Sequence, residues 1–172
     1  MSKSKNNVIS TPWKVSNEFH RYVTLPYIRL LFLWVGIPWQ TGWKFYGVPI
    51  LQRHRKSVMT FGHHFQLRSS VMSNPLGSNH RVLLCTWEAD AELIIGNHFG
   101  MTGGSIVSAH SVRIGNRVNV GANTTIADTD FHPIRPEQRR TNPQNGTNRP
   151  IVIEDDVFIG MNCLILKGTS IG

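Results

Sequence analysis

The stretch IEDDVFIGMNCLILKGTSIG, residues 153–172, places isoleucine at every sixth position, at Ile153, Ile159, Ile165 and Ile171. Earlier in the chain, aliphatic or similarly small residues keep the same period. They stand at Leu83, Ala89, Ile95, Met101 and Val107 and, after one extra residue, at Ile114, Val120 and Ile126. A period of six predicts a parallel β-helix, in which the first residue of each repeat points inward.

Stacking gives the physical reason for this repeat. Each short strand bonds to the turns above and below it, and the inward aliphatic residues form one ladder that no single repeat can bury alone. A β-sandwich would instead alternate apolar and polar residues over short runs, and that alternation is missing. The expected fold class is therefore all-β, with a β-helix over residues 58–172. Its first turn is irregular and carries Val58, Phe65 and Val71.

Residues 1–57 are expected to form a separate basic and aromatic segment that is partly helical. Residues 1–81 carry eleven Lys and Arg against Glu18 alone, a net +10, whereas residues 82–172 carry seven against nine acidic residues, a net −2. Residues 12–33 are predicted to form one amphipathic helix that breaks near Pro26. Such a helix can cap the β-helix and protect a sheet edge, or it can dock on a membrane.

The formal net charge of +8 indicates an anionic partner. The basic residues are interleaved with tryptophans in the N-terminal half, which suits a lipid headgroup interface better than a DNA groove. These tryptophans are Trp13, Trp34, Trp39 and Trp43. Nucleic acid is therefore not an expected partner, whereas peripheral membrane contact through the N-terminal segment is.

Cys85 and Cys163 lie far apart and form no CxxC pair, which favours a reducing compartment over a disulfide framework. Residues 1–12 are polar and do not have the pattern of a cleavable signal peptide. The apolar run at 30–38 is too short to cross a bilayer. We therefore expect a cytoplasmic protein that can work at the inner face of the membrane.

The stretch VGANTTIADTDFHP at 120–133 ends in the string Asp128-Thr129-Asp130-Phe131-His132-Pro133, which a polar loop follows before the repeat returns. With this string and the repeat, residues 83–172 closely resemble the hexapeptide-repeat acyltransferases of the maltose, galactoside and polysaccharide O-acetyltransferase type. The resemblance implies a left-handed β-helix and a homotrimer with each active site between two neighbouring chains. It also implies acetyl-coenzyme A (acetyl-CoA) as co-substrate and a sugar hydroxyl as acceptor, and the basic N-terminal half favours surface polysaccharide biosynthesis.

His132 matches the catalytic histidine of that family and stands at the base of the loop at 131–150. A loop of this length inside a compact domain is usually functional or disordered. Acetyl transfer needs a base that removes the hydroxyl proton as oxygen attacks the thioester, and imidazole is largely neutral at cytoplasmic pH. Asp128 or Asp130 is expected to orient the imidazole. We expect direct transfer in a ternary complex, with no acyl-enzyme.

The resemblance also assigns binding residues. Phe158, Gly160 and Met161 are expected to face the pantetheine of acetyl-CoA, although many relatives have tryptophan at the position of Phe158. Arg149 and Lys167 are cations for the nucleotide phosphates. The acceptor is expected at Met101, Thr102, Ser105 and Arg135. In relatives, further coils beyond the position of Gly172 complete the coenzyme A site, so this chain is either unusually short or truncated.

Two other functions compete with the acetyltransferase. A hexapeptide-repeat carbonic anhydrase would hold zinc with three histidines from adjacent subunits, and His98 and His132 have nearly suitable separation. No histidine follows His132 at short spacing, because Glu137 stands there instead, so no metal is expected. His54, His63 and His64 are interpreted as surface or interface residues. The other alternative is a non-catalytic trimeric scaffold of a glycan-assembly complex.

Overall fold

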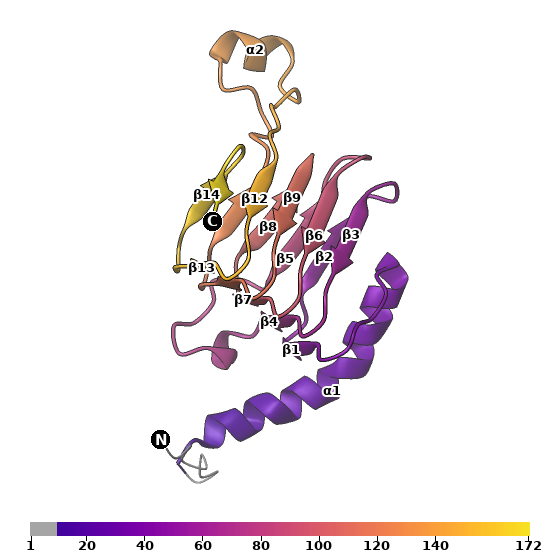
Figure 1. Cartoon of the computed structure of the whole chain (residues 1–172), viewed down its shortest axis with the longest axis vertical. Coiled ribbons are helices and arrows are strands. Elements are labelled where there is room, and N and C mark those ends of the chain that lie inside the picture. Colours follow the sequence, from indigo (N-terminus) through magenta and orange to yellow (C-terminus); the bar gives the residue numbers. More distant parts are fainter. Residues whose placement is uncertain (1–9) are drawn as a thin grey trace.

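Three parallel sheets of five strands each form the body of the molecule (Figure 1). The structure is a computed structural model that describes residues 10–172. Residues 1–9, where the polar leader ahead of the predicted helix begins, lie outside the described residues.

Each sheet draws its strands from five different parts of the chain, and neighbours in the following order are hydrogen-bonded. The first sheet contains Lys44–Tyr46 (β1), Gln66–Arg68 (β4), Gly100–Thr102 (β7), Asn119–Val120 (β10) and Phe158–Ile159 (β13). The second contains Leu164–Leu166 (β14), Thr125–Ala127 (β11), Ser105–Ser108 (β8), Leu83–Thr86 (β5) and Ile50–Arg53 (β2). The third contains Ser170–Ile171 (β15), Ile151–Ile153 (β12), Ser111–Ile114 (β9), Glu92–Ile95 (β6) and Val58–Phe61 (β3).

The chain visits the three sheets in rotation, so three consecutive strands make one turn of a helix, which we call a coil. Successive coils stack in parallel register. In the first sheet Leu67 pairs with Met101, Met101 with Val120, and Val120 with Ile159. This order confirms the parallel β-helix predicted from the period of six. Its left-handed sense stays a prediction.

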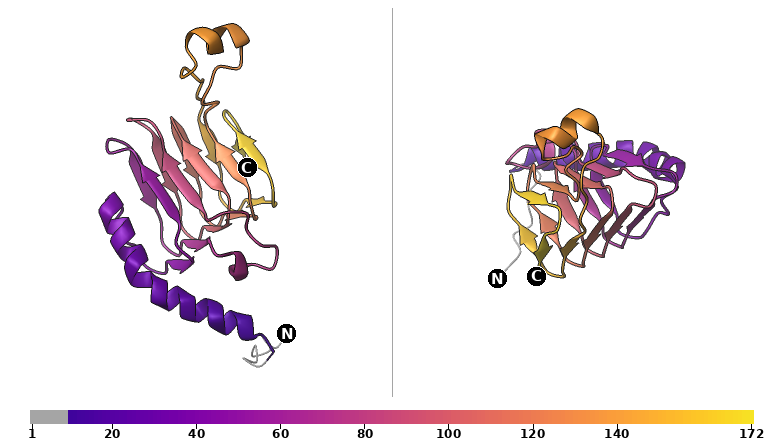
Figure 2. Two further views of the ribbon diagram at one scale, coloured as in Figure 1. Left: turned by 180° about the vertical axis from the view of Figure 1, so that it is seen from behind. Right: turned by 90° about the horizontal axis from the view of Figure 1, so that it is seen from above.

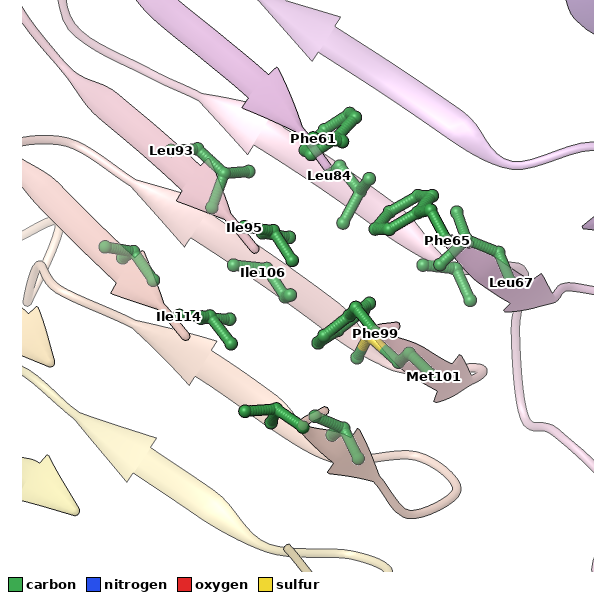
Figure 3. Close-up of a cluster of buried hydrophobic side chains, with 14 of the residues drawn as sticks. Phe61, Phe65, Leu67, Leu84, Leu93, Ile95, Phe99, Met101, Ile106 and Ile114 are labelled. Carbon is green, nitrogen blue, oxygen red and sulfur yellow. The ribbon is translucent and has the colours of Figure 1, made fainter. Parts of the chain in front are cut away.

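Inward side chains fill the space between the sheets (Figure 3). Aromatic rings stack along the axis, with 4.7 Å between the ring centroids of Phe61 and Phe65 and 5.3 Å between those of Phe65 and Phe99. Predicted ladder residues such as Ile95 and Ile114 are buried beside them. The repeat therefore buries a continuous apolar column, which is the main stabilising feature of a solenoid.

The predicted ladder is wrong by one residue in part of the second sheet. Leu84 and Ile106 pair with each other and are fully buried, in place of Leu83 and Val107. The corner at residues 103–104 explains the shift from Val107 to Ile106. Both of its glycines have positive φ, 55° and 80°, which allows a tight turn, so β8 reaches its inward position at Ile106, one residue before the predicted Val107; this corner follows Leu84 and does not explain the shift there.

The helix α1, Pro12–Val35, matches the helix predicted over residues 12–33 but is not broken at Pro26. It continues through the proline and bends, as Figure 1 shows. The bend is expected because proline lacks the N–H that would bond to a carbonyl one turn earlier. The helix ends at Gly36, whose φ of 74° lets its N–H donate to the Leu33 carbonyl at 3.0 Å.

One face of α1 covers the end of the first coil. Ile28 and Phe32 are fully buried, and the Phe32 ring centroid lies 5.0 Å from that of Trp43 and 5.2 Å from that of Phe45 in β1. This packing confirms that the helix caps the β-helix. The strands β1 and β2 pair with β4 and β5 of the second coil, so the first coil begins at Lys44. The predicted start of the β-helix at residue 58 is therefore too late.

Two insertions leave the coils. Residues 69–82 separate β4 from β5 and contain the short 3-10 helix η1, Val71–Ser73, and residues 128–150 separate β11 from β12 and contain α2, Pro136–Thr141. Figures 1 and 2 show α2 projecting beyond the sheets, in agreement with the loop predicted at 131–150. Over residues 10–172, neither α-helix combines the length and apolar character needed to cross a bilayer.

Candidate active site

Asp128 anchors the start of the projecting loop, directly after β11. It is fully buried, and its carboxylate accepts hydrogen bonds from the backbone N–H groups of Ala109 at 2.6 Å, His110 at 2.9 Å and Ser111 at 2.6 Å. The Ser108 hydroxyl donates a fourth bond at 3.1 Å. These bonds satisfy both carboxylate oxygens, so Asp128 fastens the loop to the preceding coil.

Asp130 closes the base of the loop through an ion pair. Its carboxylate bonds to the Lys167 ammonium group, which lies between β14 and β15, and accepts a bond from the Thr147 hydroxyl at 2.8 Å. Partial burial raises the pKa of Asp130, but the hydrogen bonds from Lys167 and Thr147 outweigh it, so the pKa lies below its ordinary value. Asp130 is therefore a carboxylate that ties both ends of the loop to the last coil.

The backbone before His132 has an uncommon conformation. Phe131 has a φ of 59°, and its ring meets the edge of Trp87 with 6.1 Å between centroids. Gly146 packs against this turn so closely that a Cβ there would lie 2.7 Å from the Phe131 carbonyl carbon and 2.9 Å from the His132 nitrogen. A glycine is required at 146 for this approach. The turn presents His132 as an exposed side chain.

The His132 imidazole is held by a backbone carbonyl. Its Nδ1 lies 2.7 Å from the Pro143 oxygen. Because a carbonyl oxygen can only accept, Nδ1 carries the hydrogen in this contact, and the lone pair of the neutral ring is on Nε2. The Arg139 guanidinium keeps the loop closed, since it donates to the Pro133 carbonyl at 3.0 Å and to that of Ile134.

Neither predicted carboxylate orients this ring. Within the described residues, Asp128 bonds to backbone N–H groups of the preceding coil and Asp130 bonds to Lys167, and neither hydrogen-bonds the imidazole of His132. The prediction is wrong because Asp128 is turned into the coil and Asp130 toward Lys167. The sequence does not identify the Pro143 carbonyl as the partner of His132, because every residue has a carbonyl and only the fold brings this one to the ring.

The residues predicted for acetyl-CoA lie on the last described coil and at the loop base. Phe158 of β13 is 76% exposed and Met161 is 44% exposed. Gly160 lies between them, half-buried, and its carbonyl accepts from the Thr124 hydroxyl at 2.9 Å. Arg149 is exposed, whereas Lys167 is held by Asp130.

The predicted acceptor residues are not brought together. Met101 is 2% exposed and points into the core (Figure 3), so its assignment to acceptor binding is wrong. Thr102 is also buried, and its hydroxyl accepts from the Asn74 side-chain amide at 3.1 Å, which holds the loop at 69–82. Ser105 is half-buried on β8, and Arg135 is exposed directly before α2.

His98, one of the histidines considered for a zinc site, lies against another histidine. The His98 ring stacks on His64 with 4.5 Å between centroids and 9° between planes, at a corner of the coils. Over residues 10–172, there is no cluster of three or more His, Cys, Asp and Glu side chains that could hold a metal ion.

Comparison with known proteins agrees with this architecture. Residues 150–172 match the family described as the hexapeptide repeat of succinyl-transferase. The chain is similar to the galactoside O-acetyltransferase of Lactococcus lactis subsp. lactis (strain IL1403), with 35% identity over 68 residues. That alignment covers 40% of this chain and spans 31% of the relative's length. No solved structure matches the chain. The stacked three-sheet coils and these sequence matches show a β-helix of hexapeptide repeats that is similar, over part of its length, to a galactoside O-acetyltransferase.

Proposed function

We propose that this chain is an O-acetyltransferase that moves the acetyl group of acetyl-CoA to a sugar hydroxyl, with His132 as general base. The observation that carries the proposal is the bond between His132 Nδ1 and the Pro143 carbonyl at 2.7 Å. It fixes the tautomer whose free lone pair is on Nε2, the form that a general base needs. The similarity to a galactoside O-acetyltransferase supports the choice of a sugar acceptor.

The reaction needs one proton to move twice. As the acceptor oxygen attacks the thioester carbonyl, Nε2 of His132 removes the hydroxyl proton, and the ring becomes an imidazolium stabilised by the Pro143 carbonyl. When the carbon–sulfur bond breaks, the imidazolium returns the proton to the leaving thiolate. The acetyl group thus passes directly to the acceptor, and no acyl-enzyme forms. Such a base contributes on the order of 10² to 10⁴ in rate.

The co-substrate is proposed to lie along the exposed edge of the last coil. Phe158, Gly160 and Met161 would face pantetheine, and the exposed Arg149 would meet a phosphate of the nucleotide. Lys167 already has a carboxylate partner in Asp130, so we assign it to holding the loop. Of the residues predicted to bind the acceptor, Arg135 is the cation, and it is exposed.

A homotrimer is part of this proposal. The His132 loop projects away from the sheets of its own chain (Figures 1 and 2), so a neighbouring chain is a natural source for the other side of the site. The acceptor is proposed to be a surface polysaccharide or its precursor.

The test is release of free thiol from acetyl-CoA in the presence of a panel of sugars and oligosaccharides. His132→Ala should lower acceptor-dependent turnover by about 10² or more. His80→Ala is the matched control, because His80 is also exposed and its Nδ1 also bonds to a backbone carbonyl, that of Arg81, at 2.7 Å. Equal turnover of His132→Ala and the wild type would rule out the proposed base. Binding of a glycan or partner protein without turnover would favour the non-catalytic scaffold.

A further inference from the structure

The helix α1 has a second apolar face that the described residues leave uncovered. Its first face is buried on the β-helix through Ile28 and Phe32. The other face consists of large apolar residues that are between 47% and 74% exposed, together with Trp34 at 90%. We call this set the outer face of α1. Its members are Val15, Phe19, Tyr22, Val23, Tyr27, Leu30, Leu33 and Trp34.

The outer face is a continuous stripe and not a scatter of single residues. Val15, Phe19, Tyr22, Leu30 and Leu33 recur at intervals that match the helical period, so their side chains share one side of the helix. Figures 1 and 2 show that this long helix lies along the outside of the molecule. A contiguous apolar surface of this length on a protein marks an interaction site.

Charge identifies the kind of partner. Residues 10–57 contain seven Lys and Arg against Glu18 alone, a net +6, and Glu18 is already paired with Arg21 at 2.6 Å. Lys14 and Arg29 are exposed on the helix itself. The turn after β2 adds Arg55 and Lys56, also exposed. An apolar stripe bordered by cations fits a surface that is both apolar and negatively charged.

A groove beside Trp34 joins the two features. It has a volume of about 740 Å³ and is lined by Leu31, Trp34, Arg53 and Arg55 among others. Trp34 and the two arginines therefore line one groove at the end of the helix. Tryptophan and tyrosine are favoured at the boundary between lipid headgroups and acyl chains, and arginine beside them meets phosphate.

We propose that the outer face of α1 docks in the plane of an anionic lipid bilayer. Its apolar side chains would insert at the boundary of headgroups and acyl chains, while Arg29, Arg55 and Lys56 would meet the anionic headgroups. A second copy of the chain fits this face less well, because two copies would bring the same net positive charge together. The helix lies on the bilayer surface and does not cross it.

Docking in this way leaves the loop at 128–150, which carries His132, away from the membrane. Figures 1 and 2 show α2 at the far end of the molecule from α1, with the coils between them. Membrane binding and acetyl transfer can therefore be measured separately, and loss of one does not imply loss of the other.

The experiment is co-sedimentation of the full chain with vesicles of phosphatidylcholine alone or mixed with phosphatidylglycerol. The wild type should bind the mixed vesicles and lose affinity as salt is raised. The double variant Leu33→Glu with Trp34→Glu should weaken binding by about ten-fold or more, because both side chains are exposed and would insert. Arg55→Ala with Lys56→Ala should weaken it by roughly ten-fold through loss of charge.

The matched control is Leu76→Glu with Val71→Glu, which places the same two negative charges at apolar side chains that are 61% and 60% exposed in the loop at 69–82. It should bind vesicles like the wild type. Failure of the wild type to bind mixed vesicles, or binding by both double variants equal to that of the wild type, would overturn the proposal. Light scattering tests the alternative partner, a second copy of the chain. If the wild type does not bind vesicles and Leu33→Glu with Trp34→Glu lowers the oligomeric state, the outer face is an interface between copies.

Discussion

Replacement of Asp128 by Asn tests whether this residue holds the fold or serves the reaction. The carboxylate accepts three backbone N–H groups and one hydroxyl while fully buried. Asn keeps the shape, but it can present its single oxygen at only one of the two carboxylate positions. At the other position its NH₂ group faces a backbone N–H that has lost its acceptor.

A buried group left unsatisfied costs about 1–3 kcal/mol, and bonds to a charged acceptor are worth more than bonds to a neutral one. We therefore expect Asp128→Asn to lower the free energy of unfolding by about 3 kcal/mol. Asp130→Asn is the comparison. Its side chain is less buried than that of Asp128, and an amide oxygen can still accept from the Thr147 hydroxyl, so the substitution should cost less, about 1 kcal/mol.

Urea unfolding followed by circular dichroism measures both values, and thiol release measures turnover on the same preparations. An Asp128→Asn protein as stable as the wild type would refute the structural role. If that stable variant also had much lower turnover, Asp128 would be acting on the imidazole of His132, contrary to its hydrogen bonds with the preceding coil.

Two further predictions concern the loop base. Because the folded-state pKa of Asp130 is lowered, its pair with Lys167 stabilises the fold above the ordinary pKa and is lost as pH falls through the folded value. The stability difference between the wild type and Asp130→Asn should therefore be constant near neutral pH and shrink in acid; urea midpoints that keep a fixed difference down to acid pH would contradict this. Gly146→Ala places a Cβ 2.9 Å from the His132 nitrogen, so turnover number should fall with little change in KM, while Asn145→Ala in the same loop retains activity.

The period of six was sufficient to predict the coils, since one inward aliphatic residue per strand is a requirement that stacking imposes on every repeat. The period of six gave the wrong inward residue where the corner between two strands had a different length. The two glycines at 103–104 make the chain turn early, so Ile106 and not Val107 points inward. The first coils were also harder to recognise. Phe61 and Phe65 replace aliphatic residues there, and α1 supplies part of the burial.

At the candidate site, the residue pattern predicts that His132 stands at the base of a long polar insertion in the repeat. It could not decide the partners of His132. A carbonyl such as that of Pro143 is present at every residue, and Asp128 and Asp130 both lie close in sequence to the histidine.

The roles of these side chains follow from their direction and distance in the folded chain. β11 ends at Ala127, so the next residues no longer keep the alternation of a strand: Asp128 turns into the coil and Asp130 toward Lys167, thirty-seven positions later. The same holds for α1: its pattern predicts a helix with apolar residues, but only packing shows that Phe32 is buried while Leu33 and Trp34 remain exposed. The short-range pattern fixes the strands and helices, whereas contacts between residues distant in sequence fix what each side chain meets.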